Sequence, residues 1–286
     1  MPTGALVVAT DTEPAPSAPG SLMRVLASLG TGVRLDTQPK VLGEVGSFFA
    51  LSLDILVQMV HPPFAWREFI HQAWFVARVS ILPTIFISVP FNAMAVFIIN
   101  ILLVEIGAAD FSGAGAALAC VVYIGPITTV LVVSGTGATA MCADLGARTI
   151  REEVDAMRVM GINPVRRLLV PRVVALMVNG LLLNAITTLV GLVASYFFSI
   201  YFQHVNPGSY AASLTVLVGL TDTVVAFAKA AIFGLIAGFI GCYKGVTVGG
   251  GPQGVGNAVN ETVVYTFMAL FVINVVMTAV TAKATL

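Results

Sequence analysis

Few side chains in this sequence have the type and spacing that catalysis or metal binding requires. The three histidines are scattered along the chain, at His61, His71 and His204. The three cysteines all lie in or beside apolar runs, at Cys120, Cys142 and Cys242. An odd number of cysteines without close spacing argues against a disulfide framework and against a zinc site. No serine–histidine–aspartate set or pair of carboxylates is recognisable either, so we predict no catalytic residues and no metal.

The glycine-rich run GGGPQGVG, from Gly249 to Gly256, superficially suggests a phosphate-binding loop. It lacks the Gly-Lys-Ser/Thr ending of such a loop, and no strand precedes it. We therefore predict a tight turn that needs positive φ angles, and no nucleotide or other cofactor bound by this chain. We expect no nucleic-acid partner.

Charged residues concentrate in one stretch of the chain. The residues from Arg148 to Arg172 include six of the fourteen Lys and Arg residues and three of the fourteen Asp and Glu residues. Thr149 and Glu152 have the spacing of a capping box, which predicts the start of a helix. Three apolar residues share one face of that helix: Ile150, Val154 and Met157. Gly161 and Asn163-Pro164 end it after about 16 Å, which is too short to cross a membrane.

Two interpretations of this short amphipathic helix are open: a solvated helix that rests on lipid headgroups, or a helix that docks onto a soluble partner. Its mixed charge favours docking, because a lipid-facing helix would be mainly basic. The candidate docking residues are Arg151, Glu152, Glu153, Asp155, Met157 and Arg158. We expect three further basic residues to contact anionic headgroups at the membrane surface, namely Arg166, Arg167 and Arg172.

The elements that must position this helix span a membrane. Of the 286 residues, 58% are hydrophobic and only 10% are charged, whereas a soluble domain carries about 25% charged residues. We predict an all-α integral membrane protein with five transmembrane helices, each near the length of about 20 residues that a bilayer requires. The predicted spans are Val79–Val104, Ala114–Ala140, Val170–Phe202, Val224–Tyr243 and Val263–Thr281.

A sixth apolar stretch, Val41–Val60, contains Glu44, Asp54 and Gln58 and is followed by Pro62-Pro63. A carboxylate at the bilayer centre costs about 2.5–3.5 kcal/mol. We therefore predict an interfacial or elbow helix here. The expected organisation is a flexible tail over residues 1–40, an interfacial region over 41–78 and a membrane domain over 79–286.

The distribution of Lys and Arg predicts the orientation. Basic residues precede the first span and follow the second and fourth, whereas the loops Glu105–Gly113 and Gln203–Thr221 contain no Lys or Arg. The positive-inside rule then places the N-terminus and the short charged helix in the cytoplasm, and five spans place the C-terminus outside.

Polar residues within the spans are the candidates for a substrate path. Lys229 lies well inside the fourth span, seven residues after Asp222 and on the same helix face. It either reaches outward to water or pairs within the bundle, or it meets a lipid headgroup. Three residues of the first span could line a cavity: Ser88, Asn92 and Asn100.

Two motifs carry a resemblance to a known family. The run ADLGARTIREEVDAMRVMGINPVRRLLVPRVVA resembles the signature after the second span of MlaE/YrbE-type ABC transporter permeases. The run GCYKGVTVGGGPQGVGNAVNETVV resembles the second signature of that family. Within the first motif, the matching residues are Glu153, Asp155, Ala156, Met157, Gly161 and Pro164. The likeness extends from about Phe48 to the C-terminus.

The resemblance implies a permease subunit of a lipid transporter in the inner (plasma) membrane. In this family the short charged helix is the coupling helix that meets a separate ABC ATPase dimer, which binds ATP and Mg. The sequence is most similar to the actinobacterial YrbE subunits, which implies MCE-domain partners and import of fatty acids, mycolates, sterols or phospholipids. Val248 and Asn257 replace basic residues of the family pattern, which suits one half of a heterodimer. An ion-driven secondary transporter and a structural membrane anchor are the alternatives.

Overall fold

The structure of the chain is a computed structural model that describes residues 40–60 and 64–284. The predicted tail of residues 1–40 lies outside this description except for Lys40. The chain divides into two units, Met1–Gly46 and Ser47–Leu286. The described residues of the first unit, 40–46, are helical, and the second unit contains the remaining helices. Within the described residues there is no β-strand, as the composition predicts.

Six stretches of the described residues are long and apolar enough to cross a membrane, one more than the five that the sequence analysis predicts. The additional stretch is Gly43–Val60 in helix α2 (Lys40–Val60), the segment expected to lie in the interface. Most of this stretch is exposed in the single chain, unlike the second span, whose residues are mostly buried. Length and composition alone therefore do not separate a spanning helix from an interfacial one here.

The first predicted span belongs to a much longer helix, α3 (Trp66–Glu105). Its 40 residues make about 60 Å of helix and cross the expected boundary between Arg78 and Val79 without a break. Every fourth residue from Gln72 to Asn100 is buried, and most of these residues are small or polar. Asn92 and Asn100 among them contact α8 (Val170–Gln203), the helix with which α3 makes its most extensive contact, whereas Ser80 bonds with Thr136 of the second span. Small residues let two membrane helices approach closely.

The second span is a chain of short helical segments between Ala109 and Ile150. A single 3-10 turn is followed by α4 (Ser112–Ala117), α5 (Gly125–Val132) and α6 (Thr139–Ile150). Wider π-helical turns join them at Leu118–Ile124 and Val133–Ala138. Pro126 accounts for the first of these turns, because a proline ring clashes with the carbonyl group four residues earlier, here that of Val122. A third π-helical turn, Val165–Leu169, precedes Pro171 in the same way.

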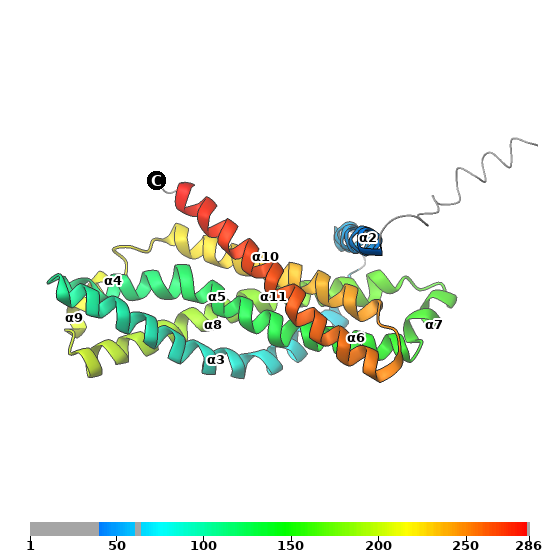
Figure 1. Cartoon of the computed structure of the whole chain (residues 1–286), viewed down its shortest axis with the longest axis horizontal. Coiled ribbons are helices and arrows are strands. Elements are labelled where there is room, and N and C mark those ends of the chain that lie inside the picture. The colour runs from blue at the N-terminus through cyan, green and yellow to red at the C-terminus, as the bar shows by residue number, and fades with distance from the viewer. Residues whose placement is uncertain (1–39, 61–63, 285–286) are drawn as a thin grey trace, which may run out of the picture. The chain divides into compact units, whose positions relative to one another are not determined.

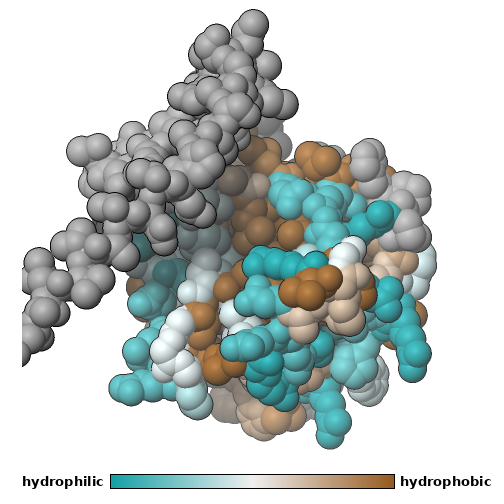
Figure 2. Space-filling view, turned by 90° about the vertical axis from the view of Figure 1, so that its right-hand side faces the viewer, coloured by the Kyte–Doolittle hydropathy of each residue, from teal (hydrophilic) through white to brown (hydrophobic). Residues whose placement is uncertain are grey.

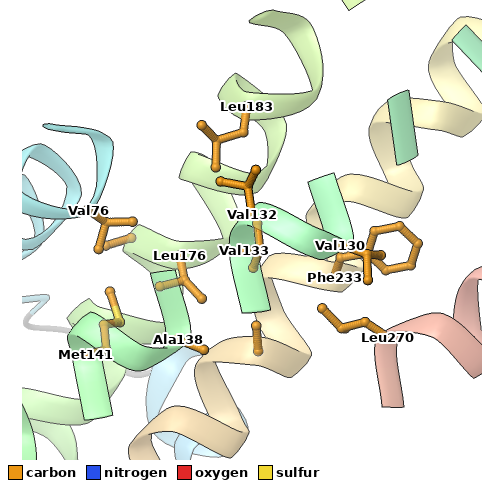
Figure 3. Packing of buried hydrophobic residues seen from close by; sticks show 12 residues of the cluster. Val76, Val130, Val132, Val133, Ala138, Met141, Leu176, Leu183, Phe233 and Leu270 are labelled. Atoms are coloured by element: carbon orange, nitrogen blue, oxygen red, sulfur yellow. The ribbon is translucent and has the colours of Figure 1, made fainter. Parts of the chain in front are cut away.

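The second span forms the centre of the membrane domain, because its segments contact α3, α8, α10 (Leu220–Val246) and α11 (Gly251–Ala284). Its valines meet Leu176 and Leu183 of α8, Phe233 of α10 and Leu270 of α11 in one buried cluster (Figure 3). Two short helices lie outside the spans: α7 (Glu153–Val159) and α9 (Pro207–Ser213). Figure 1 shows α7 and the α10–α11 turn at one end of the bundle and α4 and α9 at the other.

Candidate coupling surface and substrate cavity

The short charged helix exists, but it begins later than the sequence predicts. Helix α6 continues to Ile150, and Glu152 has φ 59°, so the chain turns sharply before α7 starts at Glu153. The predicted capping box is wrong because Thr149 lies at the end of α6. Its hydroxyl group donates to the carbonyl oxygens of Leu145 and Gly245 instead of capping α7. The predicted end is correct, since Gly161 has φ 76°.

One face of α7 holds the helix on the membrane domain. Val154 is buried and Met157 is half-buried in an apolar cluster with Leu145 and Leu168. The charged residues point away from this cluster and pair along the surface. Arg151 lies 3.1 Å from Glu153, and Arg158 donates to Asp155 at 2.9 Å. The six candidate docking residues therefore gather on one protrusion, with Met157 on its inner side.

The tip of this protrusion is apolar, which the sequence analysis missed. Val159, Met160 and Ile162 are exposed, Val159 to 89%. Figure 2 shows this end of the molecule, where hydrophobic surface lies among hydrophilic surface. Exposed apolar residues rimmed by charge are typical of a protein-binding surface. Their position in the VMGIN segment, on both sides of the helix-ending glycine, could have indicated them.

The glycine-rich run begins in the turn between α10 and α11, as predicted, but its residues from Gly251 onward belong to α11. Gly250 and Gly251 have φ angles of 82° and 71°, a conformation that side chains other than glycine rarely adopt. Beside the turn, Lys244 pairs with Glu261 at 2.6 Å and lies over the ring of Tyr265. The hydrogen bond from Thr149 to Gly245 joins this turn region to the start of the α7 protrusion.

Arg172 corrects a second expectation, because it does not contact headgroups. Its side chain is completely buried at the start of α8. The guanidinium group lies 2.5 Å from Asp144 of α6 and 3.6 Å from Glu68 of α3, and it donates to the carbonyl oxygen of Leu168. Asp144 also pairs with Arg148 at 3.4 Å. One buried cation thus connects α3, α6 and α8 at the base of the α7 protrusion.

Lys229 lies in the opposite half of the bundle. Its side chain is buried and donates a hydrogen bond to the hydroxyl group of Thr278 on α11 at 3.1 Å. Among the described residues no carboxylate lies within ion-pair distance of it. It lines a cavity of about 330 Å³ together with Tyr123, Asp222 and Thr281. Asp222 itself accepts a hydrogen bond from the backbone of Gly219 and caps α10. The outward-reaching alternative for Lys229 is therefore not what the structure shows.

The structure places Ser88, Asn92 and Asn100 together, but between two helices of the same chain. All three are buried, Asn92 beside Gly191 of α8 and Asn100 beside Ser199 of α8. The Asn92 amide group donates to the carbonyl oxygen of Ser88, and that of Asn100 donates to the hydroxyl group of Ser199. These contacts are those of packing residues, so the cavity beside Lys229 is the better-formed candidate for a substrate site.

Comparison with known sequences decides the family. The sequence profile described as Permease MlaE matches residues 69–280. The chain belongs to the MlaE permease family. The match to this family contains all of α6–α10, both signature motifs and Lys229, and it leaves α2 outside.

Relatives of this MlaE-family chain are named as permeases. The "Probable ABC transporter permease protein" of Rickettsia bellii is 27% identical over 242 residues, which cover 82% of this chain and 90% of the relative. A protein of the same description from Synechocystis is 29% identical over 168 residues, 59% of this chain and 64% of the relative. The chloroplast protein TRIGALACTOSYLDIACYLGLYCEROL 1 of Arabidopsis thaliana is 29% identical over 163 residues, 54% of this chain and 45% of the relative.

The family and these names make the chain a multi-pass membrane protein of the permease type. They confirm the MlaE part of the resemblance. These three relatives are rickettsial, cyanobacterial and plastid proteins, so the closer likeness to actinobacterial YrbE subunits stays a prediction.

Proposed function

We propose that this MlaE-family permease carries lipid across the inner membrane and is driven by a separate ATPase dimer that binds the α7 protrusion. The observation that carries the proposal is the structure of α7: a seven-residue amphipathic helix with an exposed apolar tip, fixed to the membrane domain by Val154 and Met157. The chain would contribute no ATP-binding site, and the ATPase would bind ATP and Mg.

The contacts at the base of α7 support a mechanical role. Val154 and Met157 pack into the cluster with Leu145 and Leu168, so a push on α7 would act on that cluster. Arg172 lies within this region and connects α3, α6 and α8. Closure of the ATPase pair would therefore move three spans together.

The cavity beside Lys229 is the site that we propose for the lipid headgroup. A buried ammonium group without a carboxylate partner is costly in a membrane, and such groups commonly bind a charged substrate. The cavity has apolar walls from Leu118, Val122 and Val225, which suits a molecule with one charged end. The name of the Arabidopsis relative contains a glycolipid, which agrees with a lipid substrate.

The remaining partners follow from the family resemblance. We propose that a second, unlike permease of the YrbE type completes a heterodimer, and that MCE-domain proteins deliver fatty acids, mycolates, sterols or phospholipids for import. Lipidomics of the purified complex would identify the lipid.

We propose that the α7 end lies in the cytoplasm and that five helices cross the membrane, with α2 in the interface. The loops at the α7 end carry the Lys and Arg residues, and the loops at the α4–α9 end carry none. In this arrangement the N-terminus is cytoplasmic and the C-terminus external, and Lys229 lies toward the outer leaflet.

The test is charge reversal on α7, with Glu153→Lys and Asp155→Lys combined. Like charges placed together across an interface cost several kcal/mol, and the reversed residues would also repel Arg151 and Arg158. We expect the variant to remain in the membrane, to lose the ATPase on purification and to stop transporting lipid.

The matched control reverses two exposed carboxylates at the opposite end, Glu105→Lys with Asp110→Lys. This control should keep the ATPase. Val159→Ser with Met160→Ser tests the apolar tip without changing any charge and should also release the ATPase. A fully active ATPase retained on both α7 variants would contradict the proposal.

A further inference from the structure

A second polar cavity lies at the α7 end of the bundle, beside the start of α3. It measures about 460 Å³, within the range of ligand-binding pockets. Its lining is mainly basic, with one tryptophan and one carboxylate: Trp66, Arg67, Glu68, His71, Arg148 and Arg167, with Ala65. A neighbouring cavity of about 360 Å³ shares Ala65 and Arg167 with it and adds the apolar side chains of Phe64 and Ile162.

The charges around this cavity do not balance. Both nearby carboxylates already have cationic partners. Asp144 pairs with Arg148 and Arg172, and Glu68 lies 3.6 Å from Arg172 and accepts a hydrogen bond from Gln72. These two carboxylates compensate two guanidinium groups.

Arg67 and Arg167 remain, and neither forms an ion pair with any residue that the structure describes. The cavity therefore holds an excess of two positive charges. The first backbone N–H groups of α3 lie at the same place, because the helix begins at Trp66, and a helix N-terminus adds to a positive potential.

The residues around the cavity are typical of the level of a membrane surface. Trp66 and Trp74 are exposed to 67% and 70% on the same helix, and exposed tryptophans are typical of the headgroup level of a bilayer. The apolar part of α3 follows directly, with its exposed phenylalanine, isoleucine and leucine side chains beyond Arg78. A ligand in this cavity would therefore have its charged end among the arginines and an apolar end beside Trp66 or Phe64.

We propose that this cavity binds the phosphate headgroup of an anionic phospholipid from the leaflet that surrounds the α7 end. Arg67 and Arg167 neutralise the phosphate, and Trp66 packs on the glycerol region. Because Arg148, Glu68 and Arg172 belong to one ion-pair network, the bound lipid would brace the base of the α7 protrusion. The assignment of this leaflet as the cytoplasmic one rests on the proposed function, whereas the site itself does not.

The chain contains only two tryptophans, which makes a direct test possible. In a Trp74→Phe background, Trp66 is the one fluorescent indole and it lines the cavity. The purified full chain in nonionic micelles is titrated with dibrominated phosphatidylglycerol or dibrominated phosphatidylcholine, whose bromine atoms quench tryptophan on contact. Each arginine near an anionic headgroup strengthens binding about fivefold. We therefore expect half-quenching at a roughly 25-fold lower fraction of phosphatidylglycerol than of phosphatidylcholine.

Arg67→Gln and Arg167→Gln should each reduce this preference about fivefold. Arg78→Gln is the matched control, since Arg78 belongs to the same helix and lies outside the cavity, and it should keep the preference. The three buried cysteines report correct folding of each variant through their low reactivity toward maleimide. The measurement needs neither ATPase nor transport, so its failure and the failure of the proposed function are distinguishable.

Two results would overturn the site. Equal quenching by the two lipids would show that the cavity does not select an anionic headgroup. Reversal of the quenching by excess inorganic phosphate would show that free phosphate, not lipid, is the ligand.

Discussion

The ion pairs of Arg172 predict that removing its partner Asp144 destabilises the protein more than removing Arg172 itself. Removing one partner of a buried ion pair costs about 3–5 kcal/mol, because a charge remains buried without compensation. Asp144→Ala would leave the completely buried guanidinium group of Arg172 with the more distant Glu68, at 3.6 Å, and the carbonyl oxygen of Leu168. We therefore expect Asp144→Ala to reduce stability by as much as about 3–5 kcal/mol.

Arg172→Met should cost less, although it removes the larger side chain. The carboxylates that it leaves behind are about one third exposed, Asp144 to 31% and Glu68 to 28%. Each also keeps another partner, Arg148 at 3.4 Å and Gln72 at 2.9 Å. Since water and these partners compensate the two charges, we expect a loss of about 1–2 kcal/mol.

Thermal unfolding of the full chain in detergent measures the difference. The buried cysteines become reactive toward a fluorescent maleimide when the helices separate. For a chain of this size, 1 kcal/mol shifts the melting temperature by about 2–4 °C. We expect a decrease of about 6–20 °C for Asp144→Ala and of about 2–8 °C for Arg172→Met.

The double variant Asp144→Ala/Arg172→Met provides the internal control. It contains no buried, uncompensated guanidinium group, so it should melt close to Arg172→Met and above Asp144→Ala. Additive losses in the double variant, or a larger loss for Arg172→Met than for Asp144→Ala, would refute the reasoning. Either result would mean that Arg172 does not depend on Asp144.

Two further predictions concern the cavity and the topology. Lys229→Met should reduce lipid transport by at least about tenfold, equivalent to 1.4 kcal/mol, while the amount of assembled complex is unchanged. Normal transport by the Met variant would eliminate the headgroup site. In intact cells, an impermeant maleimide should label Thr285→Cys and not Ser21→Cys, because five spans place the C-terminus outside and the N-terminus in the cytoplasm. The native cysteines are buried and should not react. Labelling of both positions would show that α2 also crosses the membrane.

The sequence predicts a spanning helix well where a continuous apolar stretch between polar loops determines its ends. The predicted span Val170–Phe202 and helix α8 (Val170–Gln203) agree within one residue at their ends, because continuous apolar sequence between polar loops determines both. Helix α3 begins earlier than predicted, because the charges of residues 66–78 are typical of an interfacial region. In the structure those charged residues belong to the same continuous helix, and one residue in four is buried along it from Gln72 to Asn100.

The candidate site was predictable only in its local features. The glycine turn and the exposed charges of α7 follow from neighbouring residues. The position of Arg172 does not, because Glu68 and Asp144 reach it from two other helices. Thr149 and Glu152 have the spacing of a capping box, yet α6 extends through Thr149, and its hydroxyl group bonds within α6 and to α10. The spacing of two residues in the sequence does not show whether they lie at the end of one helix or at the start of the next.

The π-helical turn at Val165–Leu169 makes the length of this segment as important as its composition. A π-helical turn contains one residue more than an α-helical turn. The turn therefore holds one extra residue without changing the direction in which the residues after it point. Deleting a single residue there would allow an ordinary α-helical turn to form and would keep Arg172, three residues after the turn, directed at Asp144 and Glu68. A second deletion would have no extra residue to remove and would rotate α8 by about 100° relative to α7.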